Sequence, residues 1–187
     1  MAKHPLRQLH RYTSLIISVQ LLLWTISGIY FSFNKIENIR GEQYLVAPTK
    51  PVANTSLDLI KIDFDQAKEI INKKTTLIPI TVEIINEPKR GSEFRGRELP
   101  LYKITSTAEN GQKINVYQNP YSGEIVAIRS AQWRVWDLMW GLHIMDWVDR
   151  DNIDNLLLKI FSFVALFTSI SGLILFFYKD NKKRVLN

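Results

Sequence analysis

Two long apolar blocks separated by a polar stretch dominate the pattern of this 187-residue chain. The blocks are residues 13–33 and 156–178, and each is long enough to cross a bilayer, which takes about 20 apolar residues. The first block follows a basic segment, as the core of a signal peptide does. It is longer than the roughly 7 to 15 apolar residues of such a core, and no small-residue cleavage site follows it. We therefore expect two membrane-spanning helices, the first being an uncleaved anchor.

The polar stretch begins with a segment that predicts an extended linker, residues 34–57, because it is rich in proline and small polar residues. Residues 64–75 then carry apolar side chains at helical spacing, which predicts an amphipathic helix. Ser56, Asp58 and Asp63 precede it as candidate N-cap residues.

Alternating apolar and polar positions indicate a set of short strands after this helix. Gly, Pro and Asn clusters separate them, as in an antiparallel meander. The expected strands are residues 80–87, 101–107, 113–118 and 124–129. We expect an α+β domain over residues 58–130, with the helix packed on one face of the sheet.

Charge and composition exclude several classes of protein. The net charge of +6 comes from the ends and the apolar blocks, because residues 34–155 hold 16 basic and 17 acidic side chains. No basic face is available for nucleic acid, which we exclude as a partner. The absence of cysteine excludes disulfides, thiolate metal sites and iron–sulfur clusters. The acidic residues are scattered, and we expect them to be solvated.

Basic residues flank the apolar blocks unevenly, which predicts the orientation in a bacterial inner membrane. Seven lie on the terminal sides of the blocks and four on the central sides. This bias places both terminal tails, residues 1–12 and 179–187, in the cytoplasm and the central domain outside it. The terminal set is Lys3, Arg7, Arg11, Lys179, Lys182, Lys183 and Arg184, against Lys35, Arg40, Arg150 and Lys159.

One face of the first apolar block carries polar and small residues. At 100° per residue, His10, Gln20, Trp24 and the Ser27-Gly28 pair fall on one side of the helix. An amide facing lipid is costly, so this side should face protein. The second block has a seam of small residues, Ser162, Ala165, Ser169 and Gly172, which predicts close helix packing.

A stripe of tryptophans precedes the second apolar block, within residues 131–155. Trp133, Trp136, Trp140, His143 and Trp147 recur at alternating steps of three and four, which places them on one helix face. The stripe favours an amphipathic helix lying in the membrane interface, where tryptophan is enriched. It also allows a tryptophan-walled pocket in which neutral His143 binds a haem iron. The two interpretations are compatible.

Several of these segments together resemble a known family. Gly111 to Ile125, GQKINVYQNPYSGEI, resembles the end of a PepSY domain. The spans, with Leu9-His10-Arg11-Tyr12, Ser27-Gly28, Gly141-Leu142-His143 and Ser171-Gly172-Leu173, look like the PepSY-associated transmembrane family. The resemblance implies a periplasmic PepSY-like domain, and some family members are linked to haem-dependent reduction of ferric siderophores. This chain differs in having only two spans and fewer histidines.

The resemblance and the stripe together give a functional hypothesis. We expect haem b, with His10 and His143 as iron ligands and Trp136, Trp140 and Trp147 around the cofactor. The two histidines lie at opposite edges of a bilayer about 30 Å thick, so one iron cannot take both. A homodimer or a larger membrane complex would supply the missing ligands. The alternative is a non-enzymatic, membrane-anchored PepSY module that binds or regulates a peptidase or a membrane complex.

The loop between the first two expected strands adds one further candidate. Arg95 and Arg97 lie in the charged, glycine-containing segment GSEFRGREL and could bind an anion. An exposed hairpin loop is the other interpretation. No hydrolase, zincin or nucleotide-binding motif is present, and whether the protein is an enzyme stays open.

Overall fold

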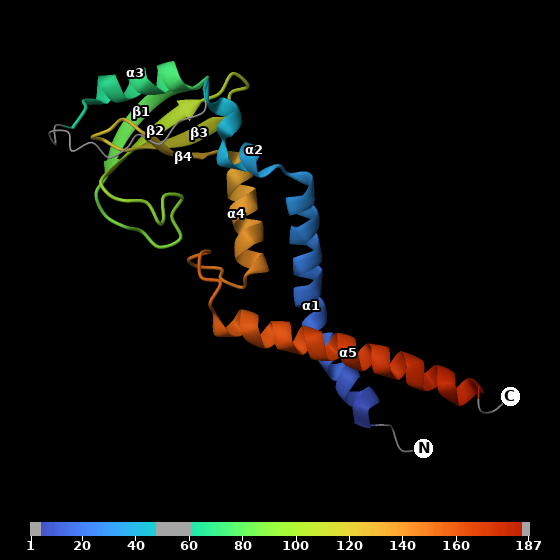
Figure 1. Ribbon diagram of the computed structural model, residues 1–187. Helices are drawn as coiled ribbons and strands as arrows, with labels where there is room; N and C mark the ends of the chain where they lie inside the picture. Colours follow the sequence, from blue (N-terminus) through green and yellow to red (C-terminus); the bar gives the residue numbers. More distant parts are fainter. Residues whose placement is uncertain (1–4, 48–60, 185–187) are drawn as a thin grey trace. The chain divides into compact units, whose positions relative to one another are not determined.

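The computed structural model describes residues 5–47 and 61–184 and divides the chain into two compact units (Figure 1). We call residues 1–29 with 140–187 the membrane unit and residues 30–139 the sheet unit. The elements in chain order are α1 (Pro5–Phe33), α2 (Ile36–Arg40), η1 (Glu42–Tyr44), α3 (Phe64–Lys74), β1 (Ile78–Ile85), β2 (Leu101–Thr107), β3 (Lys113–Gln118), β4 (Ile125–Arg129), α4 (Ala131–His143) and α5 (Leu156–Arg184).

The strands form the antiparallel meander that the alternation predicts, in the order β1-β2-β3-β4. The bounds of β2 and β3 agree with the expected ones, whereas β1 begins and ends two residues earlier. Between β3 and β4, the Asn119 side chain accepts hydrogen bonds from the backbone N–H groups of Tyr121 and Ser122. Gly123 completes this turn with a φ of 66°. The PepSY-like motif is therefore a strand, an Asn-initiated turn and a strand.

The helix α3 covers one face of the sheet, as the pattern predicts. Its Ala67 and Ile71 pack with the strand residues Ile104, Ile114 and Val116, all fully buried. Asp63 caps the helix, because its side chain accepts from the Gln66 N–H while the Gln66 side chain accepts from the Asp63 N–H. The other N-cap candidates, Ser56 and Asp58, lie outside the described residues.

The second face of the sheet is covered by the loop that joins β1 to β2. Phe94 and Leu99 from this loop pack on Leu101, Tyr117 and Ala127. The interpretation of residues 88–100 as an exposed hairpin loop therefore holds for Arg97 but not for Phe94 and Leu99. An uncovered face would leave the apolar side chains of β2, β3 and β4 in water, and the loop removes that cost.

Part of the segment predicted to be an extended linker is folded. It contains α2 and η1, and Leu45 pairs with Thr75 in an isolated antiparallel bridge. Ile39 is fully buried in α2. The described part of the segment thus belongs to the sheet unit.

Two helices are long and apolar enough to cross a membrane, over Pro5–Phe33 and Leu156–Tyr178. Their helical bounds extend beyond the apolar blocks, from Pro5 in α1 and to Arg184 in α5, because the polar flanks continue the same backbone hydrogen bonding. Most of each apolar window is exposed within the molecule. A lipid environment accounts for this exposure.

The tryptophan stripe is interrupted by the end of α4. Met145 has a φ of 57°, and the Asp146 N–H donates to the Gly141 carbonyl. These features form a Schellman motif, which ends the helix at His143. Trp147 lies beyond that end with 57% of its surface exposed, so it does not continue the helical stripe. The motif uses Met145 where glycine is usual, and therefore the sequence carried no stop signal.

Candidate functional site

The polar face predicted for α1 is confirmed within the membrane unit. Ile17, Gln20 and Ser27 are buried, and His10 and Trp24 on the same side are partly buried. The opposite side of the helix is exposed and apolar, with Leu15, Ile16, Val19, Leu22 and Ile26. The burial of Gln20, at 4% exposure, requires a polar partner.

That partner is the C-terminal end of α4. The Gln20 side-chain amide donates to the Leu142 carbonyl at 3.3 Å, and the Trp24 indole N–H donates to the His143 carbonyl at 2.7 Å. The Trp140 carbonyl accepts from the backbone N–H of Ile144, and the Gly141 carbonyl accepts from that of Asp146. All four carbonyls that a helix leaves unpaired at its end are thus satisfied, two of them by α1. This arrangement fixes the position of His143.

The His143 ring is held in one tautomer by Ser27. Its Nδ1 lies 2.7 Å from the Ser27 hydroxyl, and that hydroxyl already donates to the Leu23 carbonyl at 2.8 Å. A hydroxyl has one hydrogen, so Ser27 must accept from Nδ1–H of the neutral ring. The lone pair of the ring then lies on Nε2. Burial lowers the pKa of His143, which favours this neutral form.

His10 is held in the same way by α5. Its Nδ1 lies 2.9 Å from the Ser171 hydroxyl, which donates to the Thr168 carbonyl at 2.9 Å. Ser171 therefore also accepts from Nδ1–H, and the Ser14 hydroxyl lies 3.4 Å from Nε2. The ring lies against Gly172, where an added Cβ would be only 3.1 Å from the His10 Cε1.

The same histidine and serine arrangement therefore occurs on both spans. Each contains Ile-Ser-Gly, as Ile26-Ser27-Gly28 and Ile170-Ser171-Gly172, and each serine accepts from the Nδ1 of a histidine that follows a leucine. His10 and Ser27 are 17 positions apart on α1, about 25 Å at 1.5 Å per residue. The two histidines thus belong to separate sites. The repeated tripeptide was the sequence signal for these pairs.

The seam predicted on α5 is displaced by about one residue. Ser162 and Ser169 are exposed, and the Ser169 hydroxyl donates to the Ala165 carbonyl of its own helix. Among the α5 side chains that the structure describes, the buried polar ones are Thr168 and Ser171, and Ser171 adjoins Gly172. Small residues lie both on the exposed side of α5, with Ser162 and Ser169, and on the buried side, with Ser171. Only the contact of His10 with Ser171 identifies the buried side.

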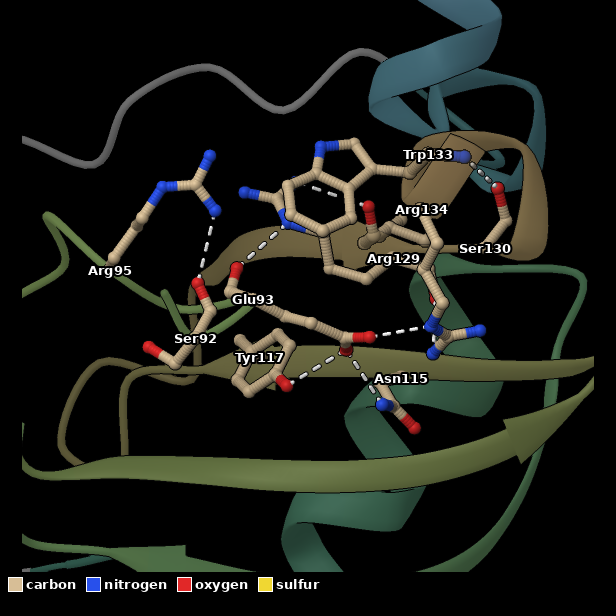
Figure 2. A network of polar contacts seen from close by, with 10 residues as sticks. Ser92, Glu93, Arg95, Asn115, Tyr117, Arg129, Ser130, Trp133 and Arg134 are labelled. Atoms are coloured by element: carbon tan, nitrogen blue, oxygen red, sulfur yellow. Dashed lines mark hydrogen bonds and ion pairs between the residues drawn. The ribbon is translucent and has the colours of Figure 1, made fainter. Parts of the chain in front are cut away.

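A second polar cluster lies in the sheet unit, around the loop that joins β1 to β2 (Figure 2). The Glu93 carboxylate accepts from Asn115 at 2.8 Å and from the Tyr117 hydroxyl at 3.1 Å, and it pairs with Arg134 at 2.5 Å. Burial by itself raises the pKa of Glu93, but these hydrogen bonds outweigh it and the pKa is lowered. The cluster ties the loop to β3 and α4.

Arginines from two elements stack on Trp133 beside this cluster. The guanidinium carbon of Arg129 is 4.2 Å from the ring centre, and that of Arg95 is 5.7 Å from it. Arg95 also pairs with Asp137, which is only 1% exposed. The expectation that the acidic residues are solvated is therefore wrong for Asp137 and for Glu93. Each needed a cationic partner from a distant segment, which the sequence does not reveal.

The three tryptophans predicted to surround a cofactor belong to two different units. Trp136 is in the sheet unit, where its ring centre is 5.8 Å from that of Phe31. Trp140 is partly buried in the last turn of α4 in the membrane unit, and Trp147 is exposed after it. Among the described residues, no group of three or more His, Asp or Glu side chains could hold a metal ion by itself.

Comparison with known proteins gives one match. The model of the family described as the PepSY-associated TM region matches residues 7–186, which include both histidine sites and the whole sheet unit. The comparisons with curated proteins and with solved structures return no match. The residues that carry the resemblance in the sequence thus fall within a single continuous match.

Proposed function

Because this chain is a membrane protein that belongs to the PepSY-associated transmembrane family, we propose that it binds b-type haem through His143 and His10 and passes electrons across the bilayer. The acceptor would be a ferric complex at the outer face. The proposal rests on the two histidine and serine pairs and not on the tryptophans.

The observation that carries the proposal is the orientation of the two rings. A histidine that binds a metal donates its other N–H to a fixed acceptor, which sets the tautomer and the direction of the ligating nitrogen. Ser27 and Ser171 are such acceptors, because each has committed its own hydrogen to a helix carbonyl. Both rings therefore have Nε2 as the basic nitrogen. The His143 site would fit a haem iron ligand, whereas at His10 the Ser14 hydroxyl, 3.4 Å from Nε2, would have to turn away first.

Bound haem would supply an iron that changes oxidation state by one electron. The protein's part is to hold the imidazoles and to keep the two sites apart. At about 25 Å along α1, His10 and His143 cannot complete one coordination sphere. A two-fold pair of chains brings each histidine to its own copy, which gives one site per leaflet. With the termini in the cytoplasm, the His10 site is the inner one and the His143 site the outer one.

The test is the absorption spectrum of the full-length protein, purified in mild detergent from haem-replete cells. We expect a Soret band and a reduced α-band in the wild type. His143→Gln and His10→Gln should each remove part of the signal, because the sites are independent and an amide does not replace imidazole as a ligand. His4→Gln, in the third histidine of the chain, is the matched control and should leave the spectrum unchanged.

The serines give a sharper test of the ring orientation. Ser27→Ala and Ser171→Ala should speed haem loss, because removing an outer partner of a ligating histidine costs about 10- to 100-fold in metal affinity. Ser18→Ala and Ser169→Ala are matched controls, since each of these hydroxyls also bonds a carbonyl of its own helix and is exposed. Equal haem loss from all four variants, or a wild type without haem, would contradict the proposal.

A second candidate function is supported by the edge of the sheet. β1 is the outer strand, and no other described strand pairs with its free edge. Its Ile78, Ile80 and Ile84 are 63%, 50% and 39% exposed. An open apolar edge can accept an added peptide strand, which would suit an anchored module that binds a peptidase segment. A wild type without haem whose β1 amides become protected by an added extended peptide would favour this function.

A further inference from the structure

A cavity of about 340 Å³ lies in the sheet unit, and the proposed electron transfer makes no use of it. Residues from α2, β4, α4 and the loop between β1 and β2 line it. Its size is within the range of sites that hold small ligands or lipid headgroups. All of its lining residues belong to one unit, so the cavity is a property of that unit alone.

The charge at this cavity is strongly unbalanced. Arg40, Arg97 and Arg129 line it, against the single carboxylate of Glu42. No carboxylate of the described residues forms an ion pair with any of these three arginines, whereas the neighbouring Arg95 and Arg134 each have one. An excess of guanidinium groups around a cavity suits an anion, because each presents several N–H donors.

Arg129 is the partly buried member of this set, whereas Arg40 and Arg97 are exposed. It donates from Nε to the Glu93 carbonyl at 2.9 Å and from a terminal nitrogen to the Ile128 carbonyl at 3.2 Å, and it stacks on Trp133. Burial, together with repulsion from Arg97 and Arg95, lowers its pKa to about 10. None of the described carboxylates forms an ion pair with the Arg129 guanidinium. An anion in the cavity would supply one.

The position of the cavity indicates the source of the anion. Ile36, which lines it, comes three residues after the end of the first span at Phe33. Trp136, also in the lining, contacts Phe31 in the last turn of that span. The aliphatic side chains of Ile36 and Ile39 share the lining with the arginines. A mixed lining of cations, tryptophans and aliphatic groups next to a span is suited to a lipid headgroup and its first acyl carbons.

We propose that this cavity binds the phosphate of an anionic phospholipid through Arg40, Arg97 and Arg129. Free phosphate could bind the same arginines, but it has no acyl carbons to contact the aliphatic side chains of Ile36 and Ile39. The inference is independent of haem, because the three arginines belong to the sheet unit and both histidines to the membrane unit.

The test measures lipid binding to the full-length protein in detergent by native mass spectrometry. Phosphatidylglycerol and phosphatidylcholine with identical acyl chains are the two probes, and we expect selective retention of phosphatidylglycerol. Arg40→Gln/Arg97→Gln should weaken this retention about tenfold or more, because charge-assisted hydrogen bonds are lost. Both side chains are exposed, so the sheet unit should keep its melting temperature. Lys113→Gln, at an exposed lysine of β3, is the control for the loss of a positive charge elsewhere on the sheet unit.

Titration with inorganic phosphate and with glycerol 3-phosphate distinguishes a lipid headgroup from a soluble phosphate as the bound anion. If these soluble anions bind with the same dependence on Arg40 and Arg97 while phosphatidylglycerol does not, the lipid assignment is wrong. Equal retention of both lipids by the wild type, or unchanged selectivity in the double variant, would overturn the site itself.

Discussion

At the scale of single residues, the glycines of the two Ile-Ser-Gly tripeptides, Gly28 and Gly172, have different surroundings. The added Cβ of an alanine at Gly172 would lie 3.1 Å from the His10 Cε1 and 3.6 Å from its Nε2, whereas one at Gly28 would meet nothing within 4 Å. Gly172 is therefore part of the His10 site. Gly28 lies in a similar sequence without such a contact.

This difference gives a prediction with a built-in control. Gly172→Ala should shift the His10 ring by a few tenths of an ångström and weaken its bond to Ser171, which is worth about 1 kcal/mol. Gly28→Ala should leave both histidine sites unchanged. Imidazole NMR chemical shifts of the full-length protein in detergent micelles report the difference. An equal shift of the His10 signals in both variants would contradict the assigned contact.

At the scale of elements, the loop between β1 and β2 is held by charge as well as by apolar contact. Phe94 and Leu99 cover the sheet, while Glu93 joins the loop to β3 through Asn115 and to α4 through Arg134. The loop lacks regular hydrogen bonding of its own. The Glu93 carboxylate therefore acts together with the apolar contacts of Phe94 and Leu99 in holding the loop.

The lowered pKa of Glu93 predicts how this loop responds to pH. A carboxyl group whose pKa is lowered by folding adds stability above its usual value of 4.5, and that stability is lost as the pH falls through the lowered value. Thermal unfolding of the sheet unit in the full-length protein, followed by tryptophan fluorescence, should show this loss on acidification. Glu93→Gln should cost about 1–3 kcal/mol at pH 7 and should reduce the acid dependence. An unaltered acid response in that variant would assign the effect to another group.

At the scale of the whole molecule, the number of spans determines where the ends lie. If both candidate spans cross the bilayer, the chain returns to the side on which it began, so that both termini share one compartment and the sheet unit lies in the other. The family match covers both crossings and the segment between them. Which compartment is which follows only from the flanking basic residues.

Reporter fusions test this orientation. Alkaline phosphatase inserted after Gly111, in the exposed turn before β3, should be active, and fused after Asn187 it should be inactive. A cytoplasmic reporter such as a green fluorescent protein should give the opposite pattern. Reversed activities would place the His143 site at the inner face, and activity at both positions would contradict two crossings.

Local pattern was sufficient for the spans, for the strands and for the polar face of α1. Hydropathy, alternation and helical spacing are all properties of neighbouring positions, and backbone hydrogen bonding is largely decided by them. For this reason β2, β3 and the burial of Gln20 and Ser27 agree with what the sequence predicts. The capping of α3 by Asp63 is equally local.

Contacts between distant positions were decided only in the tertiary structure. His143 and Ser27 are 116 positions apart, and His10 and Ser171 are 161 apart, so no local rule pairs them. The last two carbonyls of α4 take their donors from α1, and the burial of Asp137 depends on Arg95 from the loop. A polar group can be buried only where a partner is brought to it, and the fold alone supplies that partner.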